Sequence, residues 1–275
     1  MIIPYYIQIT GKNYLRKDSS NEYINKFIYN KMNEPEWNDY LQQFDLDASY
    51  FQGITKNTNK YCVIVEPRIH DKLIPVIQNF MYLLQSKGWG LIIFHGTTNE
   101  NHLQKLKDWP NIIYINLGVV NLTPNQYSDL LCSSQFWETL LKNGCKHALI
   151  FQTDTVLLND IIDDFIEYDY IGAPWCEKWL GILEVGNGGL SLRNVNKMLQ
   201  ITRIIPREYS NEDIYFSHSA LKIGAKIPTI TVAKYFAVET IFCEETCGIH
   251  QPHIHRFPNR ECFVKLLEKR WIIPK

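Results

Sequence analysis

The chain has 275 residues, of which 45% are hydrophobic and 21% are charged, and its formal net charge at pH 7 is -1. This length allows one large domain, and the composition is that of a globular protein. A charge so close to zero gives no indication of the basic surface that attracts nucleic acid or anionic membranes, so we expect neither partner. No apolar run reaches the roughly 18 residues that a membrane-spanning helix needs.

Seven cysteines are spread along the chain, an odd number that does not form the dense framework of a small disulfide-bonded domain. The first residues contain no basic stretch followed by an apolar run. We therefore expect no signal peptide and a cytoplasmic protein with reduced cysteines.

Residues 1–59 differ from the rest of the chain because they are crowded with Asn, Lys, Asp and Tyr. Within them, the segment from Pro35 to Phe44 is a candidate short helix, since proline suits the first helical turn. We expect a small, partly helical N-terminal extension over 1–59 and one larger domain over 60–275.

From residue 60 onward, short apolar runs alternate with helical patterns. Four runs rich in apolar and β-branched residues predict buried strands at 61–65, 91–94, 112–115 and 148–151. Apolar residues at helical spacing predict helices over 71–87 and 126–143, and a glycine follows each of them. Strands separated by helices predict an α/β fold with a mostly parallel central sheet.

Ligands bind such sheets beyond the carboxyl ends of the strands. Arg68 follows the first predicted strand, and Gln152, Thr153 and Asp154 follow the fourth. A carboxylate at this position is well placed to hold a divalent metal that in turn holds phosphate oxygens. An aspartate after a strand is also a common turn or cap residue, so Asp154 alone does not decide between the two interpretations.

Two later segments also allow both a functional and a structural interpretation. The glycines of GNGG at 186–189 let the backbone approach a ligand closely, although an Asn-Gly pair is also a strong hairpin-turn signal. The adjacent carboxylates of NED at 211–213 favour a helix N-terminus, and one of them is alternatively a base that takes a proton from an attacking hydroxyl.

In this order, the motifs resemble those of the GT-A glycosyltransferases. The shared segments are FQTD at 151–154, DYIGAPW at 169–175, GNGGLSLR at 186–193 and NED at 211–213, followed by His250. They are most similar to a poorly characterised GT-A-like family represented in large DNA viruses and microbes. The resemblance covers about residues 60 to 255.

This resemblance implies a GT-A (Rossmann-like) fold, in which helices flank a mostly parallel central sheet. It also implies an enzyme that transfers a sugar from a nucleotide-diphosphate sugar to a hydroxyl acceptor on a glycan, a protein or a small molecule. UDP is the expected nucleotide because it is the commonest in the superfamily, and Mn²⁺ (or Mg²⁺) is the expected cofactor.

Individual residues take roles from the same resemblance. Asp154 matches the last position of the metal-binding DxD motif, and Gln152 stands where the first aspartate is usual. Gly188 and Gly189 would pass close to the donor sugar. His250 would be a second contact to the metal or the diphosphate.

Asp213 matches the general base of the resembling family, with Glu212 as its alternative. A carboxylate on the face opposite the leaving diphosphate gives a single displacement with inversion. For the nucleotide diphosphate that the resemblance implies, Arg68 and Arg193 are candidate hydrogen-bond donors to the phosphates. Trp175 is a candidate acceptor platform, or a packing residue, because aromatic faces stack on sugar rings and also fill cores.

Two alternatives remain open. The neutral amide of Gln152 weakens the metal motif and is compatible with a GT-A-like module that binds a nucleotide or glycan without turnover. The other alternative is a structural zinc site, although the spacing matches neither zinc ribbons nor common fingers. Its five potential ligands are Cys243, Cys247, His250, His253 and His255.

Overall fold

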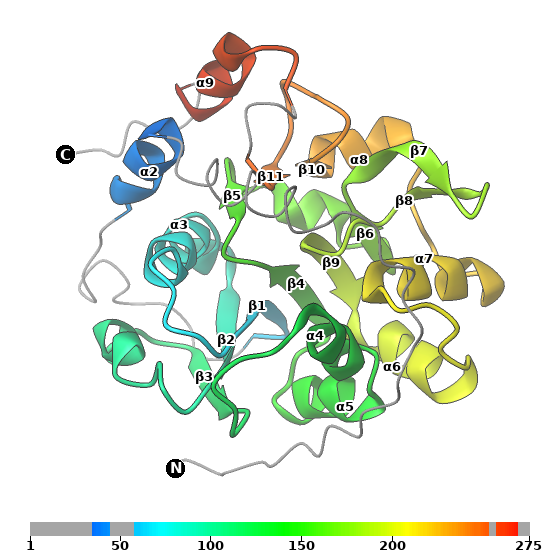
Figure 1. Cartoon of the computed structure of the whole chain (residues 1–275), viewed down its shortest axis with the longest axis horizontal. Coiled ribbons are helices and arrows are strands. Elements are labelled where there is room, and N and C mark those ends of the chain that lie inside the picture. Colours follow the sequence, from blue (N-terminus) through cyan, green and yellow to red (C-terminus); the bar gives the residue numbers. More distant parts are fainter. Residues whose placement is uncertain (1–34, 45–57, 253–256, 269–275) are drawn as a thin grey trace.

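The computed structural model describes residues 35–44, 58–252 and 257–268, and its centre is a six-stranded sheet in the order β3-β2-β1-β4-β9-β6 (Figure 1). The strands of this sheet are β1 (Lys60–Glu66), β2 (Trp89–His95), β3 (Ile112–Asn116), β4 (His147–Phe151), β6 (Tyr170–Gly172) and β9 (Leu190–Asn194). Strands β3, β2, β1 and β4 pair in parallel, whereas β9 is antiparallel to both of its neighbours. The expected α/β class with a mostly parallel sheet flanked by helices is confirmed.

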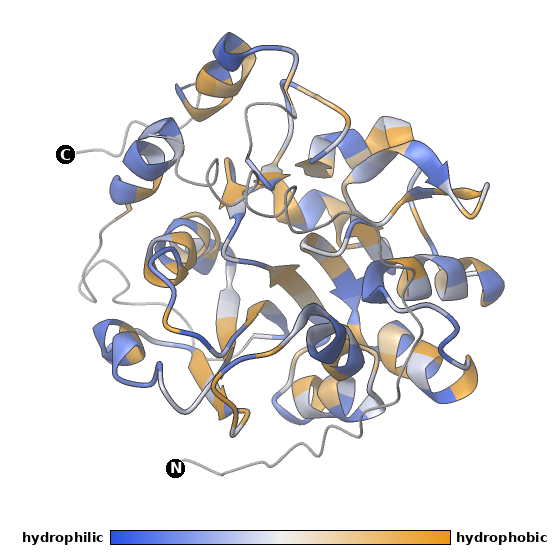
Figure 2. Ribbon diagram, viewed as in Figure 1, coloured by the Kyte–Doolittle hydropathy of each residue, from blue (hydrophilic) through white to orange (hydrophobic). Residues whose placement is uncertain are grey.

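Both faces of the central sheet are buried, and its strands are largely hydrophobic (Figure 2). Along β1, Cys62 and Ile64 belong to one core, whereas Val63 and Val65 belong to the other, as strand alternation requires. The helices of the first face are α2 (Pro35–Gln42), α3 (Leu73–Leu84), α8 (Ile230–Phe236) and α9 (Arg260–Glu268). Those of the second face are α4 (Pro124–Leu131), α5 (Ser134–Lys142), α6 (Val195–Ile204) and α7 (Glu212–Lys222).

The four predicted strands are present as β1 to β4, and the predicted helix over 71–87 corresponds to α3 and the 3-10 helix η2 (Gln85–Lys87). The prediction of one continuous helix over 126–143 is wrong, because α4 ends at Leu131 and α5 begins at Ser134. Ser133 has an extended backbone, and its hydroxyl accepts a hydrogen bond from the Phe136 N–H at 3.3 Å. This N-cap starts a second helix where the apolar pattern alone predicted continuity.

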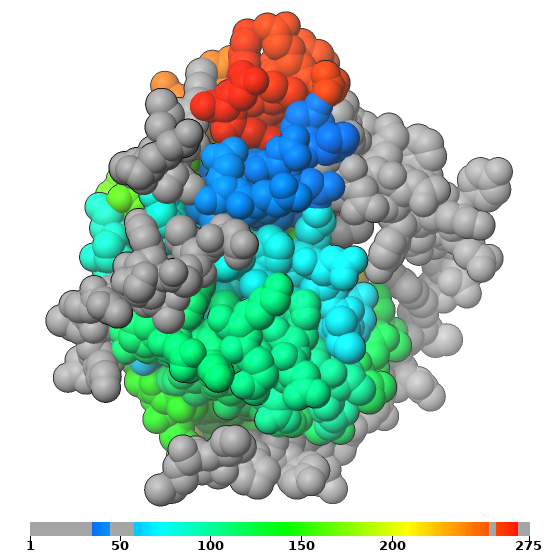
Figure 3. Space-filling view, turned by 90° about the vertical axis from the view of Figure 1, so that its left-hand side faces the viewer, coloured from blue at the N-terminus to red at the C-terminus, as the bar shows by residue number. Residues whose placement is uncertain are grey.

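Helices α2 and α9 come from opposite ends of the described chain and lie against each other (Figure 3). Arg260 of α9 forms an ion pair with Glu36 of α2. Helix α2 begins at Pro35, as its sequence indicates. The division into an extension over 1–59 and a domain over 60–275 stays a prediction, because much of the extension lies outside the described residues.

A second, three-stranded sheet positions residues from the C-terminal third of the chain next to the end of β4. Its order is β10 (Ala237–Val238), β11 (Gly248–His250) and β5 (Thr155–Leu157), with β11 antiparallel to β5 and parallel to β10. The buried side chain of Asn79 on α3 holds β5 in place. Its Oδ1 accepts from the Leu157 N–H at 2.8 Å, and its Nδ2 donates to the Leu157 carbonyl at 2.9 Å.

The remaining elements lie around these two sheets. Strands β7 (Pro174–Trp179) and β8 (Leu183–Val185) form a separate hairpin, and two 3-10 helices are η3 (His102–Leu106) and η4 (Ile161–Phe165). Among the helices of residues 35–44, 58–252 and 257–268, none combines the length and the apolar character needed to cross a bilayer.

Candidate functional site

The chain turns sharply where β4 leads into β5, and this turn presents Asp154. The Gln152 carbonyl accepts hydrogen bonds from the Thr155 N–H at 3.2 Å and from the Thr155 hydroxyl at 2.6 Å. The Asp154 carbonyl accepts from the Gln251 N–H at 2.8 Å. The residue after β11 is thereby tied to the residue before β5, which brings Asp154 and His250 together.

His250 lies between two carboxylates from neighbouring strands. His250 is the last residue of β11, where it pairs with Thr155 of β5. Strand β10 lies on the other side of β11, and Glu239 directly follows it. His250 Nε2 is 3.6 Å from Asp154 Oδ1, and its Nδ1 is 3.8 Å from Glu239 Oε1. The side chain is only 4% exposed, and neither ring nitrogen has a hydrogen-bond partner within the described part of the chain.

The electrostatics of His250 follow from these neighbours. Burial favours the neutral imidazole, but the nearby carboxylates of Asp154 and Glu239 favour the charged form more strongly. The pKa of His250 is therefore raised above its ordinary value. The environment of this ring is negatively charged and favours a cation.

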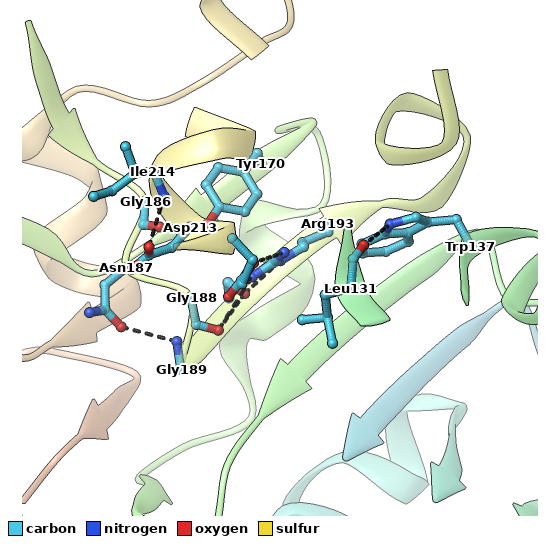
Figure 4. Close-up of polar contacts among 12 residues, drawn as sticks. Leu131, Trp137, Tyr170, Gly186, Asn187, Gly188, Gly189, Arg193, Asp213 and Ile214 are labelled. Carbon is cyan, nitrogen blue, oxygen red and sulfur yellow. Dashed lines mark hydrogen bonds and ion pairs between the residues drawn. The ribbon is translucent and has the colours of Figure 1, made fainter. Parts of the chain in front are cut away.

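The glycine-rich loop between β8 and β9 passes close to two groups of the candidate site. Figure 4 shows Gly188 of this loop next to Arg193. A Cβ atom at Gly188 would overlap the Glu212 carboxylate, and one at Gly189 would overlap the His250 imidazole. The Asn187 Oδ1 accepts from the Gly189 N–H at 3.1 Å and holds the turn. Any side chain at either glycine would displace one of these groups, so the close approach requires glycine at both positions.

Arg193 lies behind this loop and is fully buried. Its Nη1 is 2.7 Å from Glu212 Oε2, its Nη2 is 3.2 Å from Glu212 Oε1, and its Nε donates to the Ser191 hydroxyl at 2.9 Å. The guanidinium carbon lies 4.9 Å from the ring centre of Tyr170 and 5.3 Å from that of Phe216. Arg193 was expected to contact donor phosphates, but its donors are engaged inside the protein.

Asp213 has no ion-pair partner in the described part of the chain, in contrast to Glu212, whose two oxygens both contact Arg193. Its Oδ1 accepts from the Ile214 N–H at 2.8 Å in the first turn of α7. Burial raises the pKa of Asp213 to about 7, and the Glu212 carboxylate adds to the rise. A carboxyl group whose pKa lies near neutral pH suits general acid–base chemistry.

Arg68 and Gln152, which are predicted to contact the nucleotide-sugar at the strand ends, each lie against another side chain of the protein. Arg68 Nε is 2.8 Å from Glu66 Oε1, and Arg68 Nη2 is 2.7 Å from Glu66 Oε2. The Arg68 side chain remains 41% exposed. The half-buried Gln152 side chain lies beside the hydroxyl of Tyr127, a half-buried residue of α4.

Trp175 is less accessible than an acceptor platform requires. It is 7% exposed and packs with Leu183 and Ile214, so most of its face is used inside the protein. Trp179, at the other end of β7, is 48% exposed, and the two indole ring centres are 6.4 Å apart.

The residues of the zinc alternative are only partly within the described chain. Cys243 and Cys247 lie in the apolar core, and His250 faces the two carboxylates instead. His253 and His255 lie outside the described residues. Among the described residues, no group of three or more His, Cys, Asp or Glu side chains is placed to hold a metal ion. The zinc alternative stays an untested prediction.

Sequence analysis missed two residues of this site, Asn187 and Glu239. Asn187 stands inside the glycine-rich motif and was interpreted only as part of a turn signal. Glu239 follows β10, a strand of two residues whose apolar pattern is too short to recognise. Its position became evident only from the pairing of β10 with β11.

Residues 113–252, about half of the chain, match DUF5672, a protein family of unknown function. The chain belongs to this family. No curated protein matches it. Among solved structures, this DUF5672 protein is similar to the glycosyltransferase GlyE of Streptococcus pneumoniae TIGR4, with 12% sequence identity and a TM-score of 0.41 over 62% of this chain. The match spans 45% of GlyE, less than half of its length, and carries no argument about activity.

Replacing Arg193 of the DUF5672 chain by methionine should destabilise it strongly, because Glu212 would be left buried without its counter-charge. We expect a loss of about 3–5 kcal/mol in the free energy of unfolding. The matched control is Arg203→Met, which breaks the exposed ion pair with Glu138 and should cost on the order of 1 kcal/mol or less. Urea denaturation measures both, and equal losses would contradict the structural role of Arg193.

The raised pKa of Asp213 predicts a pH-dependent effect of Asp213→Asn. Between the unfolded pKa of 3.8 and the folded pKa of about 7, the native protein holds a proton that the unfolded chain has lost. The stability contribution of Asp213 is therefore present at low pH and lost as the pH rises through 7.

The asparagine variant should gain stability relative to the wild type as the pH rises from about 4 to 8. Denaturation across this range measures the difference, with Asp164→Asn as the exposed control. Glu212, Arg193, Glu239 and His250 are electrostatically coupled to Asp213, so the curves are compared as differences at each pH. A constant difference would contradict the raised pKa.

Proposed function

We propose that the protein is a glycosyltransferase that moves a sugar from a nucleotide-diphosphate sugar, UDP-linked, to a hydroxyl acceptor, with inversion and with the help of a divalent metal. The observation that carries the proposal is the arrangement around Gly188 and Gly189. One of these neighbouring residues contacts the Glu212–Asp213 helix start, and the other contacts His250. A carboxyl group suited to acid–base work and a candidate cation site therefore lie on either side of a single peptide.

The residues present fit a divalent cation held by Asp154 and His250. His250 Nε2 is buried without a partner among the described residues and lies 3.6 Å from Asp154 Oδ1. A set of one carboxylate and one imidazole accepts Mn²⁺, or Mg²⁺ with more water ligands. When bound, a divalent cation neutralises the charge that develops on the leaving diphosphate.

Asp213 is the best candidate for the group that takes the proton of the acceptor hydroxyl. A hydroxyl is a poor nucleophile at neutral pH, and a positioned carboxylate assists it because the proton moves as the new bond forms. Glu212 is less suited to this role, since both of its oxygens contact the Arg193 guanidinium. With Asp213 on the face opposite the diphosphate, the displacement inverts the anomeric carbon.

The donor would meet the carboxyl ends of β1 and β4, as ligands do in open α/β sheets. Exposed Arg68 offers positive charge there, although it shares that charge with Glu66. Gln152 offers a neutral amide for a ribose or nucleobase contact. On the acceptor side, exposed Trp179 provides a more accessible aromatic face than Trp175.

A screen of thermal stability against UDP, GDP and CMP, with and without Mn²⁺, tests the proposed site. The wild type should be stabilised by UDP only when Mn²⁺ is present, by about 2.7 kcal/mol at a ligand concentration of 100 times Kd. Asp154→Ala should lose this effect, whereas Asp164→Ala at an exposed position of η4 should keep it. If no nucleotide stabilises the wild type, the proposal fails.

Product analysis tests the chemistry. Transfer from a UDP-sugar should yield the inverted anomer, and kcat should rise with pH through about 7 as Asp213 loses its proton. Asp213→Asn should lower kcat by about 10²–10⁴-fold while UDP binding is retained. Retention of the donor configuration would contradict inversion. If the wild type binds a nucleotide but transfers no sugar, the result would favour the alternative of an inactive binding module, which the neutral amide of Gln152 suggests.

A further inference from the structure

Glu239 belongs to neither the metal motif nor the base, yet it faces the ring of His250. We infer that Glu239 is a positioning residue, which accepts the Nδ1 proton of His250 and so leaves Nε2 free for a divalent cation held together with Asp154. This inference rests on the proposed function, because it assigns a role within the same metal site.

The two carboxylates next to His250 contact different nitrogens of its ring. Asp154 Oδ1 is 3.6 Å from Nε2, whereas Glu239 Oε1 is 3.8 Å from Nδ1. A cation held through Nε2 would therefore be held by His250 and Asp154, whereas Glu239 faces the other ring nitrogen. The Nδ1–Oε1 distance is just beyond hydrogen-bond range, so a small rotation of either side chain completes the contact.

Glu239 is held at this place from both of its ends. The residue before it, Val238, pairs with Ile249 of β11, so the strand register brings Glu239 level with His250. The residue after it, Thr240, accepts from the Cys176 N–H at 3.0 Å, and its hydroxyl donates to the Pro174 carbonyl at 3.1 Å. The backbone on either side of Glu239 is thus tied to β11 and to β7.

The burial of Glu239 also needs an explanation. The side chain is 8% exposed, and its Oε2 has no hydrogen-bond partner in the described part of the chain. Within that part, His250 is the only basic side chain in an ion pair with it. A carboxylate with so little compensation is costly to bury, so its position beside an imidazole points to a functional role.

The chemistry of histidine as a metal ligand explains what Glu239 would do. A metal binds the lone pair of a neutral imidazole, so the proton must reside on the other nitrogen. A group that accepts a hydrogen bond from one ring nitrogen keeps the proton on that nitrogen and leaves the other for the metal. A carboxylate is a common acceptor in this role. Removing such an acceptor typically weakens metal binding by about 10–100-fold.

Two measurements on the full chain test the inference. In the metal-free protein, ¹⁵N chemical shifts of His250 should show the proton on Nδ1 at a pH where the ring is neutral, and Glu239→Ala should change this tautomer. In the presence of saturating UDP, Mn²⁺ titration followed by electron paramagnetic resonance should show affinity lowered about 10–100-fold in Glu239→Ala. Glu239→Gln should lose less, because its amide oxygen still accepts the Nδ1 proton.

The matched control is Glu138→Ala, which removes an exposed carboxylate paired with Arg203 and should leave both readouts unchanged. Asp154→Ala should abolish Mn²⁺ binding and leave the ring proton on Nδ1, because the carboxylate facing Nε2 is then gone, and this separates a ligand from a positioning residue. Equal Mn²⁺ affinity and the same tautomer with and without Glu239 would overturn the inference alone. A folded wild-type protein that takes up no Mn²⁺ with any nucleotide would overturn the proposed metal site, and the inference with it.

Discussion

The buried contact between Arg193 and Glu212 joins the central sheet to the helix that carries the candidate base. Removing a guanidinium from water is costly unless its donors are satisfied, and here two carboxylate oxygens and the Ser191 hydroxyl satisfy them. Because Glu212 is the first residue of α7, the pair fixes where this helix starts relative to β9. Burial raises the pKa of Asp213, the Glu212 carboxylate of the pair adds to the rise, and the Arg193 guanidinium opposes it.

The remaining charges of the site are unbalanced. Asp154, Asp213 and Glu239 surround a single histidine, and Arg193 is already paired. Carboxylates that share a buried site repel one another, and a cation relieves the repulsion. Asp154 and His250 alone are few ligands for Mn²⁺, so oxygens of a diphosphate would have to complete the coordination. Cation and nucleotide would then bind cooperatively, each raising the affinity for the other by the same factor.

Local patterns in the sequence predicted the framework of the fold, because apolar runs and helical spacing report burial directly. The strands β1 to β4 and the helix start at Asn211 follow from such patterns. The break at Ser133 did not, since one serine hydroxyl outweighed a continuous apolar period. The burial of Arg193 and the approach of Glu239 to His250 depend on contacts between distant segments, which no local pattern encodes.

Gly188 and Gly189 connect the two halves of the candidate site. Neighbouring Cα atoms are only about 3.8 Å apart, so a ligand that touches this loop is within reach of both the α7 start and His250. The distance between the start of α7 and His250 is therefore set by the backbone of Gly188 and Gly189, which is stiffer than a long side chain. A substitution at either glycine would push a different group aside, Glu212 in one case and His250 in the other. The loop thus keeps the candidate base and the proposed cation ligand His250 in one fixed relation, as the proposed single displacement at one carbon would require.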